Sequence, residues 1–154
     1  MKGPVVRTLN SLSLDEAQRI LTSILRTAQI DGGKPVSIAV VDAHGDLLAF
    51  AHMDGTKGPS RPVAIAKART AVEFGRDTMG FCHLVDPDDT RVWIDNPEGW
   101  DGRDHHNAIS NHPGGRVMTW GGGTVVIVDK EVVGGVGVSN RTEAEDHALA
   151  SIRP

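Results

Sequence analysis

Three histidines in the segment WDGRDHHNAISNHPGG, residues 100–115, are the side chains best suited to chemistry. His105, His106 and His112 lie within eight positions of one another. Neutral imidazole is a common ligand for zinc, iron, copper and nickel, and histidine also transfers protons near neutral pH. Because neighbours in an extended chain point in different directions, we expect one of His105 and His106 to act with His112, alongside Asp104 or His83. The spacing matches no established metal motif, so a polar loop with hydrogen-bonded histidines is the alternative.

Two cations are candidates for holding an anion. Lys67 lies among small residues in AIAKARTA; facing a sheet, it could bind a carboxylate or act as a base, and otherwise it extends to solvent. Arg116 follows a glycine pair at the start of a predicted strand, where a guanidinium can bind an anion through two hydrogen bonds. Asp54 ends another predicted strand. It is a candidate for a further polar contact with the ligand, and the alternative is that it caps a turn.

The stretch TWGGGT, residues 119–124, offers backbone donors. Without side chains, Gly121, Gly122 and Gly123 expose amides that can point at an oxyanion or a haem face, with Thr119 beside them. A β-bulge or a tight turn would also use these glycines. They open a strand and lack the strand-GxGxxG-helix context of a dinucleotide site.

From about residue 80 to 113 the hydrophobic periodicity disappears and acidic residues outnumber basic ones. Trp93 and Trp100 are two of the three tryptophans of the chain, and disordered segments are poor in aromatic residues. Loops of this length are uncommon unless they are functional. We expect a lid or pocket wall in which Trp100 contacts the ligand; a subunit-contact arm and plain decoration are the alternatives.

The composition predicts a single domain over 1–154, with an atypical insertion at about 80–113. The net charge of −4 gives no general attraction to nucleic acid or to an anionic membrane. The single cysteine, Cys82, allows no internal disulfide and fits a reducing compartment. We therefore expect a cytoplasmic protein that binds neither nucleic acid nor membranes.

Helical and strand periodicities alternate along the chain. Ser13 begins a capping box with Glu16 ahead of helically spaced apolar residues, and short turns between apolar runs predict hairpins. The expected helices cover 14–29, 60–75 with Ser60 as cap, 77–84, and a last helix beginning at Asn140 or Thr142. The expected strands cover 36–42, 46–53, 116–120 and both arms of a hairpin around 129–130. The order α-β-β-α-(α)-loop-β-β-β-α indicates an α+β fold with an antiparallel sheet.

Several of these segments together resemble a known family. SIAVVDAHGDLLAFAHMDG, IAKARTAVEFG, a GGR followed after five residues by GGTVVIVDKEVVGGVGVS, and TEAED resemble the GlcG/HbpS family in the same order. That family includes the haem-binding C-terminal domain of PduO-type proteins and is labelled haem-degrading. The resemblance implies a profilin-like fold, an antiparallel five-stranded sheet flanked by helices. It also implies a homo-oligomer, a dimer or often an octamer, and a setting in catabolic operons.

The chain departs from this family at three places. It has no histidine before His44, where the haem-binding PduO-type domains carry one near the N-terminal helix. His52 stands where an arginine commonly precedes Met-Asp. The long segment 80–113 replaces a short connection.

Three functions are consistent with these residues. The resemblance implies a haem- or iron-binding protein, in haem turnover or sensing. The residues also suit a small-molecule enzyme, a metal- or histidine-dependent lyase, isomerase or hydrolase acting on a compact anionic hydroxy or keto acid. A non-catalytic assembly module is the third. The implied cofactor is haem or a divalent metal ion.

Overall fold

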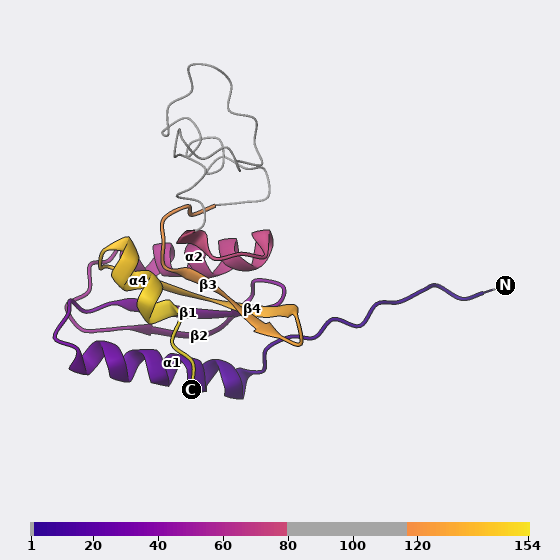
Figure 1. The fold of residues 1–154 in the computed structure, drawn as a ribbon, viewed down its shortest axis with the longest axis horizontal. Helices are drawn as coiled ribbons and strands as arrows, with labels where there is room; N and C mark the ends of the chain where they lie inside the picture. Colours follow the sequence, from indigo (N-terminus) through magenta and orange to yellow (C-terminus); the bar gives the residue numbers. More distant parts are fainter. Residues whose placement is uncertain (1, 80–116) are drawn as a thin grey trace, which may run out of the picture.

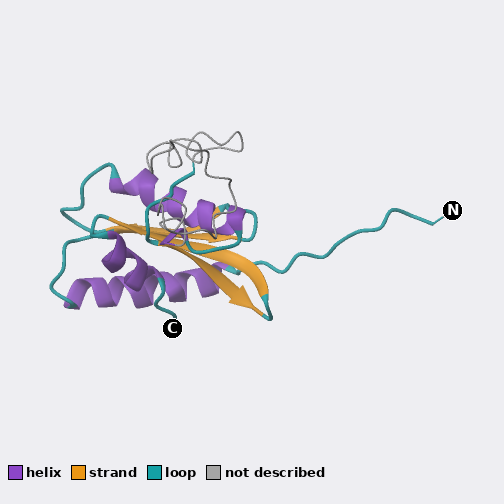
Figure 2. Ribbon diagram, turned by 45° about the horizontal axis from the view of Figure 1, so that its top comes forward, coloured by secondary structure: helices purple, strands orange, loops and turns teal. Residues whose placement is uncertain are grey.

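The computed structural model describes residues 2–79 and 117–154 of the chain. These residues form one antiparallel sheet of four strands with helices on both faces (Figure 1, Figure 2). The strand order is β2-β1-β4-β3. The elements are α1 (Leu14–Ile30), β1 (Ser37–Asp42), β2 (Leu47–His52), α2 (Ser60–Phe74), β3 (Gly123–Val128), β4 (Glu131–Ser139) and α4 (Glu143–Ala150).

The helix α1 covers one face of the sheet, as its sequence pattern predicts. The Ser13 hydroxyl accepts a hydrogen bond from the Glu16 amide at 3.2 Å, which caps the helix. Ile20 and Ile24 are fully buried where α1 packs on β1 and β2, and α4 adds Leu149 to the same core. This apolar layer is the larger of the two cores in the described residues and fixes α4 beside α1.

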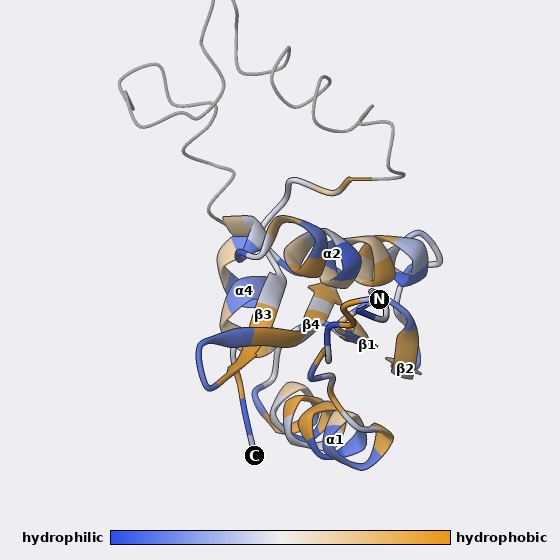
Figure 3. Ribbon diagram, turned by 90° about the vertical axis from the view of Figure 1, so that its right-hand side faces the viewer, coloured by the Kyte–Doolittle hydropathy of each residue, from blue (hydrophilic) through white to orange (hydrophobic). Residues whose placement is uncertain are grey.

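The helix α2 lies on the opposite face, unusually close to β4 (Figure 3). Its sheet-facing residues are small, including Ala64 and Ala68. A β-carbon at Gly135 would lie 2.6 Å from the Ala68 carbonyl oxygen, and one at Gly137 would overlap the Ala64 carbonyl oxygen. Glycine inside a strand permits a close approach of this kind, and here the approaching group is a helix backbone.

Both predicted hairpins are confirmed. The turn between β3 and β4 places Asp129 at φ 50° and Lys130 at φ 67°, which is the left-handed pair typical of a two-residue hairpin turn. The prediction that Ser60 caps α2 is wrong: Pro59 occupies the cap position, and the Ser60 hydroxyl donates to the Lys57 carbonyl oxygen at 2.7 Å.

A fifth strand, predicted over 116–120, is not found in its described part. Residues 117–120 have no strand structure, and the Met118 amide donates to the Thr70 hydroxyl of α2 at 2.9 Å. The outer edge of β3 is also occupied by side chains, because Asp77 accepts from the Val125 amide at 2.9 Å and Arg153 donates to the Val125 carbonyl at 3.1 Å. The described residues thus form an α+β fold with four strands, and the profilin-like label stays a prediction.

One further prediction lies only partly within the described residues. Of the helix predicted over 77–84, the structure describes 77–79 alone, where a 3₁₀ turn begins. Within 2–79 and 117–154, no helix combines the length and the apolar character that a membrane span requires.

Candidate functional site

The predicted site residues divide between two parts of the chain. The predicted histidines, tryptophan and arginine lie outside the described residues: His105, His106, His112, Trp100 and Arg116. The remaining candidates are described: Lys67, Asp54, Thr119, Gly121, Gly122 and Gly123. Only Lys67 and the glycines converge on one place, at the start of β3.

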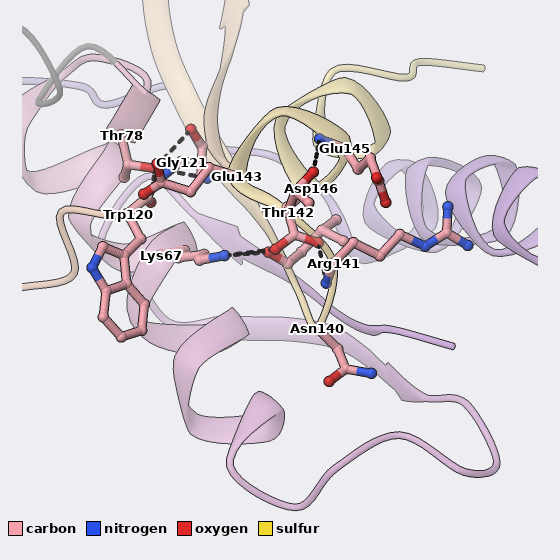
Figure 4. A network of polar contacts seen from close by, with 12 residues as sticks. Lys67, Thr78, Trp120, Gly121, Asn140, Arg141, Thr142, Glu143, Glu145 and Asp146 are labelled. Carbon is pink, nitrogen blue, oxygen red and sulfur yellow. Dashed lines mark hydrogen bonds and ion pairs between the residues drawn. The ribbon is translucent and has the colours of Figure 1, made fainter. Parts of the chain in front are cut away.

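Lys67 is buried, with 2% of its surface exposed. Its Nζ atom donates to the Val138 carbonyl oxygen at 2.9 Å and to Asp146 Oδ2 at 3.0 Å (Figure 4). Lys67 therefore faces the sheet, which is one of the two interpretations of the sequence. It does not extend to solvent, which is the other. The carboxylate it binds belongs to the protein itself and comes from the first turns of α4.

Gly122 creates the passage through which Lys67 reaches α4. Its φ is +120°, and an added β-carbon would lie 2.8 Å from Lys67 Nζ and 2.6 Å from the Val138 carbonyl oxygen. Only glycine leaves room for the lysine here while adopting this backbone conformation.

The neighbouring glycine amides are already hydrogen-bonded to side chains. The Gly121 amide donates to Glu143 Oε1 at 3.2 Å, and the Gly123 amide donates to the Thr78 hydroxyl at 2.8 Å. The turn therefore uses these two amides to fix α4 and the segment after α2.

Asp146 is the residue of this site that the sequence analysis does not single out. It is 2% exposed and accepts from Lys67 and, at 3.1 Å, from the Arg141 amide. Burial raises the pKa of its carboxyl group, against the opposing effect of the Lys67 charge. A favourable interaction with the helix dipole accounts for acids at the start of a helix, yet Asp146 shares a buried face with Leu149 and Ala150 at spacings of three and four. That spacing is the signal in the sequence from which a buried position of Asp146 could be predicted.

A polar cavity of about 440 Å³ opens beside this pair. We call it the Lys67 cavity; the described residues that line it are Lys67, Trp120, Ser139, Asn140, Arg141, Glu143 and Asp146. Trp120 is 54% exposed. The Arg141 side chain extends away from Lys67 (Figure 4) and binds both carboxylate oxygens of Asp31, at 2.5 and 2.9 Å.

That second ion pair fixes the segment between β4 and α4. The hydrogen bonds from Arg141 lower the pKa of Asp31, and Asp31 raises the pKa of Arg141. Asn140, next in the chain, has φ 111° and donates from Nδ2 to the Pro35 carbonyl oxygen at 2.7 Å. The cavity wall at Asn140 is thus held by contacts with the loop after α1.

The other candidates lie apart from the cavity. Asp54 is exposed in the turn after β2, and Thr119 is buried without lining the cavity. His52, noted for its position before Met-Asp, has its Nδ1 atom 2.7 Å from the Ser37 hydroxyl. No cluster of three or more histidine, cysteine, aspartate or glutamate side chains suited to a metal occurs in the described parts of the chain.

Known proteins share sequence and fold with this chain. The family model described as "Haem degrading protein HbpS-like" matches residues 12–152. Protein GlcG of Escherichia coli (strain K12) is 31% identical over 126 residues, which are 80% of each chain. Protein ORFY of Klebsiella pneumoniae has a TM-score of 0.78 over 97% of this chain and 92% of its own, at 23% identity. PduOC, solved as a haem complex, has a TM-score of 0.71 over 91% of this chain and 90% of its own, at 26% identity.

Proposed function

Because this chain belongs to the HbpS-like family, we propose that it is a haem-binding protein. One observation carries the proposal: the fold of PduOC, which was solved with haem bound, extends over nearly the whole of this chain. The description of the matching family model as haem-degrading supports the same assignment.

We infer that the axial ligand comes from the segment 80–116, which holds four of the seven histidines of the chain. His44 is exposed in the β1–β2 turn, and His52 is hydrogen-bonded to Ser37. The Nδ1 atom of His147 is buried within the protein. The Lys67 cavity does not suit a porphyrin, because its walls are polar and carry two carboxylates.

We therefore place the haem against the histidine-rich segment. His105, His106 or His112 would ligate the iron, and Trp100 would contact the porphyrin face. Arg116 would bind a propionate through two hydrogen bonds. Lys67 is excluded from that role because Asp146 already neutralises its charge.

The test is a haemin titration of metal-free protein, followed by its visible absorption. We expect a saturable, shifted Soret band that one of His105→Ala, His106→Ala and His112→Ala abolishes. His44→Ala is the matched control, since it removes an exposed histidine from a turn of the sheet, and it should titrate like the wild type. A spectrum equal to the sum of free haemin and protein would refute the proposal.

The same preparation separates the uses of haem. A role in turnover predicts loss of the Soret band and release of iron when a reductant and oxygen are added, whereas a sensing role predicts a stable complex. Sedimentation analysis would measure the expected homo-oligomer. A protein that assembles but never binds haemin would favour the assembly module instead.

A further inference from the structure

We propose that the outer edge of β2 pairs with the same edge of a second copy of this chain, so that two sheets join into one antiparallel sheet. The strand order β2-β1-β4-β3 leaves two edges, and the two differ (Figure 3). At the β3 edge, Asp77 and Arg153 bind the amide and the carbonyl group of Val125. In the described residues, β1 is the only strand that pairs with β2. A further strand can therefore add at the β2 edge.

The hydrogen bonds between β1 and β2 show which backbone groups face that edge. The Met53 amide donates to the Val36 carbonyl oxygen at 3.1 Å. Antiparallel partners alternate between pairs that exchange hydrogen bonds and pairs that do not. His52 and Phe50 stand at odd spacings before Met53 in the regular part of the ladder, so their N–H and C=O groups point away from β1. Within 2–79 and 117–154, these groups have no hydrogen-bond partner.

The sequence of β2 lacks the residues that usually protect an open edge. Exposed edges carry charged side chains, above all lysine, or proline, and these oppose pairing with another chain. The strand LLAFAH contains no lysine, arginine, acid or proline. Leu47 is 48% exposed, and Phe50 is only half-buried although it packs on the smaller core. A strand added at this edge would cover apolar side chains as well as backbone groups.

The edge of β2 is complementary to itself. The ladder with β1 shifts register between Val40 and Val41, so the regular part of β2 is 49–52. A two-fold axis through Ala51 places Phe50 of each copy opposite His52 of the other, where their outward N–H and C=O groups pair. Ala51 then faces its own copy in a pair without hydrogen bonds, where the Cα atoms lie about 4.5 Å apart. The small alanine side chain suits this approach, and a two-fold contact closes as a dimer.

The charges at the two ends of β2 favour a second copy as the partner. The turn before β2 is net acidic, and the segment after β2 is net basic. The charged side chains of the turn are Asp42, Asp46 and, from α2, Arg69, and those of the segment are Asp54, Lys57 and Arg61. Antiparallel pairing places the turn of one copy beside the segment of the other. Opposite net charges therefore meet at both ends of the shared ladder.

Sedimentation velocity of the full chain tests the proposal. We expect the wild type to sediment as a dimer or as a multiple of a dimer. Leu47→Lys adds a positive charge to the edge, beside the basic segment of the other copy, and should lower the particle mass at least twofold. Ile127→Lys is the matched control, because Ile127 is 57% exposed on β3, at the opposite edge of the sheet. The control should keep the wild-type mass, and circular dichroism should show that both variants are folded.

A disulfide tests the position of the two-fold axis. In a background with Cys82→Ser, Ala51→Cys should form an intermolecular disulfide under mild oxidation, because the axis brings this position of both copies together. Ala148→Cys is the control, since Ala148 is exposed on α4, away from the β2 edge. A monomeric wild type, equal masses of the two lysine variants, or an Ala51→Cys variant that cross-links no faster than Ala148→Cys would overturn the proposal. These measurements contain no haemin, so their outcome is independent of the haem proposal.

Discussion

Replacing Lys67 with methionine removes one charge of the buried pair and keeps most of the side-chain length. Lys67 Nζ and Asp146 Oδ2 are 3.0 Å apart, and unit charges at that distance attract by roughly 5–6 kcal/mol at an effective dielectric constant of about 20. Desolvation offsets part of this attraction, so breaking a buried pair costs about 3–5 kcal/mol of folding free energy. In a chain of this length, that loss lowers Tm by roughly 6–20 °C.

The penalty should depend on pH. Burial already raises the pKa of Asp146 above its unfolded value, and removing Lys67 removes the charge that opposes this shift. A carboxyl group with a raised folded pKa favours the folded state at low pH, and that contribution is lost as the pH rises through the folded pKa. Lys67→Met should therefore lose most stability at neutral pH and less in acid, where Asp146 takes up a proton.

Urea denaturation between pH 5 and 8 would measure both effects, with Asp146→Leu and the double variant completing a thermodynamic cycle. The double variant should be more stable than Lys67→Met, since an apolar pair leaves no buried charge without a partner. Additive single losses, together with a Lys67→Met penalty that does not change with pH, would refute the electrostatic account. Loss of packing alone would then explain the result.

Two further changes test other contacts of the fold. Gly137→Ala should destabilise the protein by about 3 kcal/mol or more in urea denaturation, because its β-carbon would overlap the Ala64 carbonyl oxygen. Gly3→Ala is the control and should leave the stability unchanged, because the space around Gly3 is open. Equal effects of the two substitutions would contradict the close packing of α2. Asp31→Asn keeps an acceptor for the Gly33 amide but loses the charge that binds Arg141. The pKa of Asp31 is lowered in the folded state, so the stability that its ionised carboxylate contributes is present above about pH 4 and is lost as the pH falls through the folded pKa. The difference in stability between Asp31→Asn and the wild type should therefore shrink in acid. A difference that does not change with pH would show that the ion pair contributes nothing.

The elements with local signals were predictable from sequence. The capping box at Ser13 and the buried spacing of α1 agree with the structure, as do both hairpins. The strand predicted at 116–120 failed because its apolar alternation could not show that Thr70 would take the Met118 amide. Side chains of Asp77 and Arg153, from distant parts of the chain, occupy the β3 edge at which a further strand would pair. Non-local contacts of this kind leave no periodicity in the sequence.

The candidate site was harder to predict than the fold, for a related reason. Lys67 lies among alanines on nearly every side of α2, so the sequence does not say which face meets the sheet. Asp146 stands with two other acids in the first turns of α4, where a favourable interaction with the helix dipole explains all three equally well. Only the rotation of α4, set by the burial of Leu149, separates the buried acid from its exposed neighbours.

The glycines of β3 and β4 connect the fold to the Lys67 cavity. Gly135 and Gly137 bring α2 close enough to the sheet that Lys67, near its centre, starts from a buried position. Gly122 then leaves a passage across the end of β3, and Asp146 receives the lysine on the far side of it. The geometry of the cavity is therefore set by the absence of side chains at these positions, because a β-carbon at any of them would displace α2 or the lysine itself. Glycine, which has no functional group of its own, thus determines where the charged groups of Lys67 and Asp146 can meet.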